Sequence, residues 1–171
     1  MHFARIATRA VVGGLFVGHG TQKLLGWFGG PGLEGAAAGF DSMGLRPGRR
    51  NAVAASVAET AGGAALALGL AMPLAGAALI GSMVTAIRTV HLKNGPWNGD
   101  GGYEYNLVLI AAVATLVEVG PGALSLDHAR GRVRQGPLWT LAALAAGAAG
   151  STAVLRLARR ESAAHPVPAA G

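Results

Sequence analysis

The chain has 171 residues, of which 51% are hydrophobic and 13% are charged, and its mean hydropathy is +0.43. A soluble domain carries about 25% charged residues, so this composition excludes an ordinary soluble domain and indicates an integral membrane protein. The net charge of +6 does not indicate nucleic-acid binding, because the charges stand in short clusters at the ends of apolar runs. The absence of cysteine excludes a thiolate zinc site and an iron–sulfur cluster held by this chain.

Five apolar segments are long enough to cross a bilayer as helices, which takes about 20 residues each. The first four extend over 6–28, 51–71, 73–92 and 103–119. The fifth, 137–157, is richer in alanine and is followed by a cluster of arginines. The sequence therefore predicts an all-α membrane protein, a four-helix transmembrane bundle with a fifth, C-terminal transmembrane helix.

The loops between these segments carry their own signals. In the long first loop, apolar residues recur at helical spacing from Leu33 to Met43, which predicts a short interfacial helix. Aromatic residues gather around the first and third loops, as in the aromatic belt at a membrane surface: Trp27, Phe28, Trp97, Tyr103 and Tyr105. The last residues, 161–171, are alanine, proline and polar residues, and we expect a disordered tail.

Ionisable and amide side chains concentrate on the side of the membrane where the first loop lies. If successive helices alternate in direction, segments one and three end on that side, and segments two and four begin there. The polar residues near these points are His19, Gln22, Lys23, Glu59, Arg88, His91, Glu104 and Asn106. Charges in lipid are unfavourable unless they face partners or water, so we expect these side chains to meet in a polar cavity in one leaflet.

A purely structural alternative stays open for this group. Lys23, Arg88, His91 and Glu104 lie close enough to helix ends to extend to the lipid headgroups. Glu59 lies deeper, and an ion pair with Lys23 or Arg88 is its structural alternative. On the opposite side of the membrane, Asp127 and Glu118 are expected to cap or orient helices. The histidines and carboxylates lack metal-ligand spacing, and we predict no metal site.

The chain resembles the DoxX family of small bacterial membrane proteins over about residues 5–127. The pieces that carry the resemblance are His19-Gly20 with Lys23, the run from Trp27 to Gly32, Glu59 with Gly62-Gly63, His91, Asn94-Gly95 before Trp97, Gly102 with Glu104, Gly120-Pro121-Gly122 and Ser125-Leu126-Asp127. The resemblance implies a four-helix membrane domain over 1–127. The basic loop and fifth helix, 128–160, lie outside it. It also implies participation in membrane-associated redox chemistry.

Three functions are compatible with these features. The first is a membrane subunit of a redox system that binds a quinone-like molecule, with Glu59 and His19 as the catalytic residues that exchange protons. Its substrate-binding residues would be Lys23, Gln22, Arg88, His91, Glu104 and Trp97. The second is a transporter of ions or small molecules, which would also require polar groups in the other leaflet. The third is a scaffold that docks a soluble redox enzyme. The sequence does not decide whether the chain is an enzyme.

The expected surroundings follow from the same features. A quinone is the one candidate cofactor, and the lipid bilayer, a soluble redox protein and a second copy of the chain are the candidate partners. The expected location is the bacterial inner membrane, crossed several times. Arg5 and Arg9 share one side with Arg130, Arg132 and Arg134, and with four spans this favours a cytoplasmic N-terminus. With five spans the C-terminal arginines join the other side, and the charge asymmetry nearly cancels.

Overall fold

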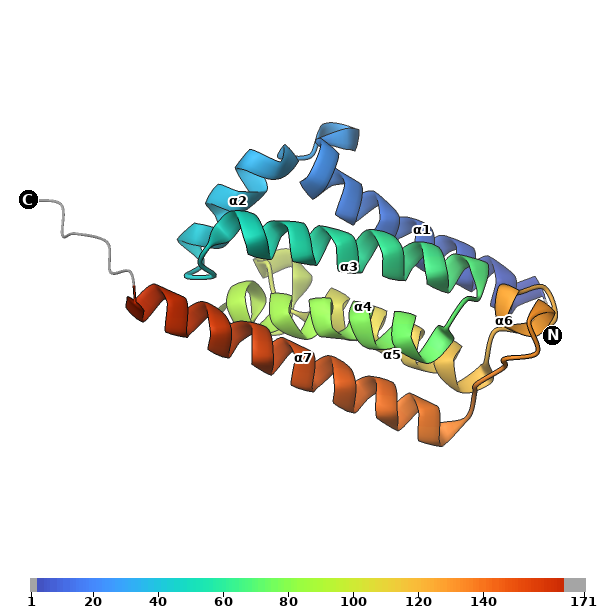
Figure 1. Cartoon of the computed structure of the whole chain (residues 1–171). Coiled ribbons are helices and arrows are strands. Elements are labelled where there is room, and N and C mark those ends of the chain that lie inside the picture. The colour runs from blue at the N-terminus through green and yellow to red at the C-terminus, as the bar shows by residue number, and fades with distance from the viewer. Residues whose placement is uncertain (1–2, 165–171) are drawn as a thin grey trace, which may run out of the picture.

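Each of the five apolar segments forms a long helix in the computed structural model, which describes residues 3–164 and is all-helical in that range (Figure 1). These helices are α1 (Phe3–Leu25), α3 (Gly48–Leu68), α4 (Met72–Ala86), α5 (Glu104–Val119) and α7 (Pro137–Ala164). The short helix predicted in the first loop is α2 (Gly32–Ser42), and a further short helix, α6 (Leu126–Ala129), precedes α7.

The helix ends follow local backbone chemistry. Gly69 ends α3 in the left-handed conformation (φ 64°), and the amide of Leu70 donates to the carbonyl oxygen of Ala65 at 2.8 Å, a typical glycine-terminated helix end. Pro73 lies in the first turn of α4, where its missing N–H is not needed. The link between α3 and α4 is therefore a tight turn that comprises Gly69 to Ala71.

The C-terminal end of α4 changes its helical geometry. Residues Ile87–His91 (η2) form a π-helix, and Leu92–Asn94 (η3) a 3-10 turn; a second 3-10 turn, Asn98–Asp100 (η4), lies in the third loop. A further 3-10 turn, Trp27–Gly29 (η1), follows α1. A π-helix bonds residue i to i+5 and so has more residues per turn than an α-helix, which changes the direction of the side chains that it carries.

The helices pack around α4, which contacts α3, α5 and α7, while α1 lies against α3 and also touches α5. Large buried side chains fill the spaces between them: Phe16, Leu66, Met72, Leu79, Ile80, Val113 and Val117. At one end of the bundle, called here the α2 end, lie the C-terminal ends of α1 and α7 and the beginnings of α3 and α5 (Figure 1). The opposite end, called the α6 end, holds the beginnings of α1, α4 and α7.

A close contact between α1 and α3 in the core depends on glycine. A Cβ atom placed on Gly13 of α1 would lie 2.5 Å from the carbonyl oxygen of Gly63, and one on Gly63 would lie 2.6 Å from the carbonyl oxygen of Gly13. The two backbones therefore touch directly, as small residues allow between membrane helices. On the other side of α1, a Cβ on Gly14 would meet no atom within 4 Å.

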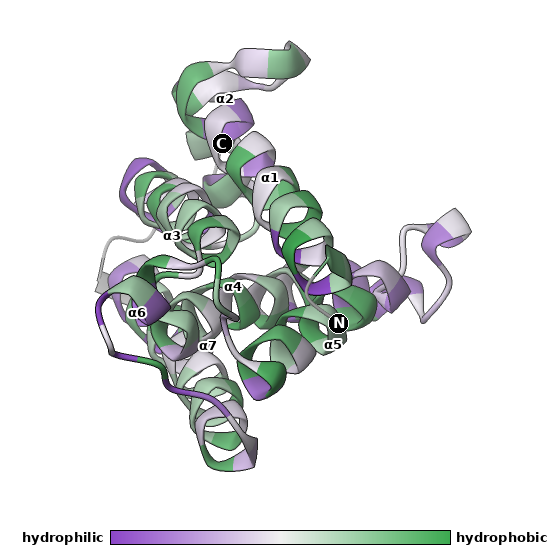
Figure 2. Ribbon diagram, turned by 90° about the vertical axis from the view of Figure 1, so that its right-hand side faces the viewer, coloured by the Kyte–Doolittle hydropathy of each residue, from purple (hydrophilic) through white to green (hydrophobic). Residues whose placement is uncertain are grey.

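Hydrophobic residues predominate along the long helices (Figure 2), and many of them are exposed on the outside of the bundle. Exposed examples are Val11, Leu15, Val57, Leu74, Val108, Leu138 and Leu141. Within residues 3–164, two helical stretches are long and apolar enough to cross a membrane by length and composition, Met72–Asn94 and Pro137–Ser162. Helix α5 is shorter than a typical span, because its 16 residues extend about 24 Å. Helices α1 and α3 are less apolar, because they carry charged residues within the predicted spans.

Helix α7, the predicted fifth span, packs against α4 and α5 and is thus in contact with the predicted 1–127 domain. It also extends past the predicted boundary at residue 160, so residues 161–164 are helical rather than part of a disordered tail. The rest of that predicted tail lies outside the described residues. Helix α2 packs on α3 and α1, with Ala36 and Ala37 buried against Ala52.

Candidate functional site

A cavity of about 680 Å³ extends among α1, α3, α4, α5 and α7. Most of its lining is apolar and comes from alanine, leucine, methionine and valine side chains. Its polar lining residues are His19, Lys23, Asn51, Glu59, Ser82, Thr85, Thr89, His91, Asn98, Tyr105, Asn106 and Ser151. A volume of 300–1,000 Å³ with an apolar wall and a few polar groups is typical of a small-molecule site.

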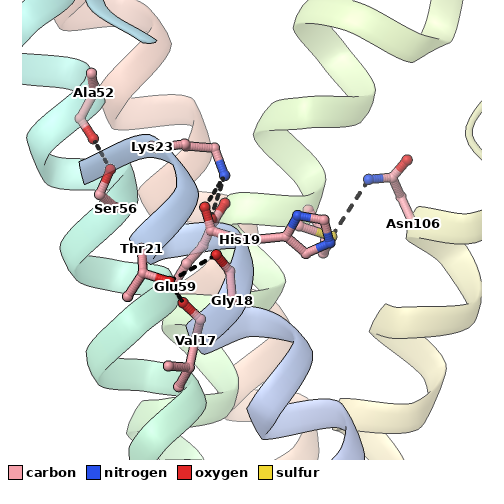
Figure 3. A network of polar contacts seen from close by, with 10 residues as sticks. Val17, Gly18, His19, Thr21, Lys23, Ala52, Ser56, Glu59 and Asn106 are labelled. Atoms are coloured by element: carbon pink, nitrogen blue, oxygen red, sulfur yellow. Dashed lines mark hydrogen bonds and ion pairs between the residues drawn. The ribbon is translucent and has the colours of Figure 1, made fainter. Parts of the chain in front are cut away.

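An ion pair between α1 and α3 forms part of the cavity wall (Figure 3). Lys23 Nζ lies 2.5 Å from Glu59 Oε2, and the Glu59 side chain is only 7% exposed against 27% for Lys23. Lys23 Nζ also donates a hydrogen bond to the carbonyl oxygen of His19 at 3.2 Å. Glu59 is therefore held in the interior by a cation from the last turn of α1, which is one of the two pairings expected from the sequence.

His19 lies on the same wall, one turn before Lys23. Its side chain points from α1 toward the side on which Asn106 of α5 lies (Figure 3). Within residues 3–164 its ring makes no hydrogen bond.

Two further polar side chains of the cavity, His91 and Asn106, have defined partners. His91 Nδ1 lies 2.7 Å from the carbonyl oxygen of Gly101, and because a carbonyl only accepts, Nδ1 carries the proton of this bond. The other ring nitrogen of His91 is not used by this bond. Asn106, which is buried, donates to the sulfur of Met83 at 3.4 Å, a weak acceptor.

Four of the predicted substrate-binding residues do not line this cavity. Arg88 donates to the hydroxyls of Thr152 (2.9 Å) and Ser151 (3.4 Å) on α7 instead of meeting Glu59. The reason is the π-helix at Ile87–His91: residues three apart share a face of an α-helix, but the wider turn separates Arg88 from His91. The sequence expectation assumed a regular α-helix here.

The other three lie in or beside the loops. Glu104 Oε1 accepts from the backbone N–H of Asn98 at 2.7 Å and thereby braces the third loop. Trp97 is 65% exposed. Gln22, in the last turn of α1, has its backbone packed closely against Gly30. The cavity thus brings together four of the predicted catalytic and substrate-binding residues: Glu59, His19, Lys23 and His91.

Sequence reasoning missed several hydroxyl and amide groups of the cavity. Asn51 donates from its side chain to the carbonyl oxygens of Leu45 and Pro47, both at 3.0 Å, at the start of α3. Ser82 and Thr85 of α4 also line the cavity. Their spacing of three residues within an apolar segment was the available signal, since two polar residues so spaced share a helix face.

The α6 end is closed by two buried charged residues. Arg9 is 3% exposed and donates to the carbonyl oxygens of Ala67 (2.8 Å), Leu124 (3.1 Å) and Pro121. Asp127 is 4% exposed and accepts from the backbone N–H groups of Ala71 (2.9 Å) and Met72 (3.2 Å) at the start of α4. The expected capping role of Asp127 is confirmed. Arg9, expected only to orient the chain, instead joins α1 to α3 and to the loop after α5.

An all-helical chain with apolar outer faces and its charged groups gathered at the two ends defines a helical integral membrane protein. Residues 4–92, slightly more than half of the chain, match the sequence model of the DoxX family, and the chain belongs to this family. The match covers α1 to the π-helix after α4, and so includes His19, Lys23, Glu59 and His91. No curated protein and no solved structure matches the chain significantly.

Proposed function

We propose that this DoxX protein is a membrane subunit of a redox system and binds a quinone-like molecule in the cavity among α1, α3, α4, α5 and α7. The observation that carries the proposal is the Lys23–Glu59 ion pair in the wall of a mostly apolar cavity. An apolar ring system fits such a wall, and the polar groups lie where they can meet its carbonyl oxygens.

The donor set suits a quinone carbonyl. An ammonium has three N–H donors, and Lys23 uses two of them, toward Glu59 and the carbonyl oxygen of His19. The third is available for a ligand oxygen. A quinone, when bound, takes up two electrons and two protons, and the chain offers Glu59 and His19 as proton-exchanging groups. The electrons must come from a redox partner or directly from a substrate, because the sequence has no cysteine to hold an iron–sulfur cluster or to form a redox-active disulfide.

Our proposed membrane arrangement has all five long helices crossing the bacterial inner membrane, with the cavity in the leaflet at the α2 end. The exposed Trp27, Phe28 and Trp97 lie near that end, where amphipathic rings favour the headgroup level. The N-terminus would be cytoplasmic, together with the exposed Arg130, Arg132 and Arg134. Arg9 contributes less to this charge asymmetry than the sequence suggests, because it is buried.

A transport path is a weaker candidate. It would need polar groups that continue from the cavity to the α6 end. Beyond the cavity, the described interior includes Leu66, Met72 and Val117, all 0% exposed. Arg9 and Asp127 are bonded to backbone groups there.

The proposal is tested with purified protein in detergent and a short-chain ubiquinone analogue, with binding measured by isothermal titration calorimetry. Glu59→Gln removes the negative charge that holds Lys23 in the cavity wall, so Lys23 loses its fixed position toward the ligand oxygen, and we expect affinity to fall about tenfold or more, the value of a charge-assisted hydrogen bond. The matched control is Glu34→Gln, because the Glu34 side chain is 87% exposed and far from the cavity lining. Unchanged affinity in the Glu59 variant would overturn this site.

A further inference from the structure

A second cavity at the α2 end has a different character from the first. It measures about 540 Å³ and lies between the end of α4 and the end of α7. Three arginines line it, Arg88 from the π-helix and Arg156 and Arg159 from α7, and no acidic residue does. Thr89 and Thr152 add hydroxyls, and Leu92 and Leu155 add apolar surface. We call it the arginine groove.

The local structure gathers these side chains. Leu155, Arg156 and Arg159 come three, four and seven residues after Thr152, so the four residues share one face of α7. The π-helix turns Arg88 toward the same face, where Thr152 accepts from its guanidinium at 2.9 Å. Several guanidinium N–H donors of Arg88 remain available, since Ser151 and Thr152 occupy only one nitrogen.

The groove keeps its positive charge. Within residues 3–164 none of its three arginines forms an ion pair, whereas the nearby carboxylate of Glu161 is 2.6 Å from Arg50. Ser162 also donates to the carbonyl oxygen of Gly44 at 3.4 Å. The first contact ties the end of α7 to the start of α3, and the second ties it to the loop before α3, which supplies Met43, Gly44 and Leu45 to the groove. These contacts hold the end of α7 in place, while the three arginines of the groove have no carboxylate partner within the described residues.

The position of the groove indicates what kind of anion it meets. Arg156 and Arg159 lie in the last part of Pro137–Ser162, the stretch of α7 that is long and apolar enough to span the bilayer. Lipid phosphates lie at the ends of such runs, and basic pockets between membrane helices bind anionic headgroups. The exposed Leu92 and Leu157 beside the arginines offer contact with acyl chains. Arginine is also suited to bind phosphate oxygens in pairs.

We propose that the arginine groove binds the phosphate of an anionic phospholipid and so fixes the ends of α4 and α7 in the headgroup layer. Its arginines do not line the quinone cavity, although Met43, Leu45 and Thr89 line both, and the proposal does not depend on the function proposed for that cavity. It also gives Arg88 a role different from the one expected from the sequence.

The test compares two triple variants of the full chain. The first removes the groove arginines, Arg88→Gln, Arg156→Gln and Arg159→Gln. The control removes the exposed arginines of the opposite end, Arg130→Gln, Arg132→Gln and Arg134→Gln, with the same change of net charge. Native mass spectrometry of the protein in detergent measures retention of phosphatidylglycerol against phosphatidylcholine with the same acyl chains.

The expected result is that the wild type and the control prefer phosphatidylglycerol, and that the groove variant loses about tenfold or more of this preference. Equal losses in both triple variants, or no preference in the wild type, would overturn the proposal. Displacement of the lipid by an equal concentration of glycerol 3-phosphate would also overturn it, because the site would then take a free anion. The single variant Arg159→Gln keeps the test valid if the triple variant does not fold, and about a fivefold loss is expected for it.

Discussion

Replacing Arg9 by methionine is expected to destabilise the protein strongly, although Arg9 lies far from the proposed quinone site. Methionine has a similar length and fills much of the same space, so the change removes mainly the guanidinium. That group donates to three carbonyl oxygens, on Ala67, Leu124 and Pro121. These belong to the end of α3 and to the loop after α5, and they would lose a shared partner in the interior.

The magnitude follows from the number and kind of these bonds. A hydrogen bond that involves a charged group contributes about 1.5–3 kcal/mol. The sum over the three acceptors overstates the net contribution of Arg9 to stability, because burial of the guanidinium itself is unfavourable. We therefore expect a loss of about 3–5 kcal/mol, the range for breaking a buried charged contact. For a chain of this size that corresponds to roughly 10 °C in Tm.

The assay is thermal unfolding of the detergent-solubilised protein, followed by circular dichroism. The matched control is Arg5→Met, one helical turn earlier, because Arg5 makes no hydrogen bond or ion pair within the described residues; a change below about 1 kcal/mol is expected. Arg9→Lys keeps the charge but offers a single ammonium, and it should fall between the wild type and Arg9→Met. If Arg9→Met and Arg5→Met had the same Tm, the assignment of Arg9 as a link between helices would be refuted.

Three further changes test other contacts of the structure. Asp127→Ala removes the acceptor of two backbone N–H groups at the start of α4, and chemical denaturation should show a loss of about 1–2 kcal/mol; no loss would contradict its capping role. Lys23→Met should destabilise the protein by leaving Glu59 unpaired, and adding Glu59→Gln should recover part of that loss, so a double-mutant cycle with no coupling would argue against the ion pair. Gly13→Ala should lower the Tm because its Cβ would lie 2.5 Å from a carbonyl oxygen, whereas Gly14→Ala should not; equal effects would contradict the close approach of α1 and α3.

The helices were predictable because long apolar runs with glycine and proline at their ends leave few alternatives. The turn after α3 illustrates this, since Gly69 and Pro73 mark the two helix ends. The packing of α7 on α4 and α5 was not predictable in the same way. Hydropathy indicates that a segment is apolar, but it does not indicate which neighbour will cover its faces.

The candidate site was predictable where regular helix geometry holds. His19 and Lys23 are four residues apart on α1, and both line the cavity beside Glu59 as that spacing implies. Arg88 departs from the expectation because a π-helix interrupts α4, and such a change of hydrogen bonding has no clear mark in the sequence. Arg9 was underestimated because its acceptors are carbonyl groups of a distant loop, whose positions depend on the whole fold.

The most direct test of the proposed function is the affinity of the short-chain ubiquinone analogue for the wild type, for Glu59→Gln and for the exposed control Glu34→Gln. The ion pair at 2.5 Å places Glu59 and Lys23 in the wall of the cavity, so the account predicts measurable binding that falls about tenfold or more in Glu59→Gln and is unchanged in Glu34→Gln. Equal affinity in all three proteins, or no binding to the wild type, would contradict it.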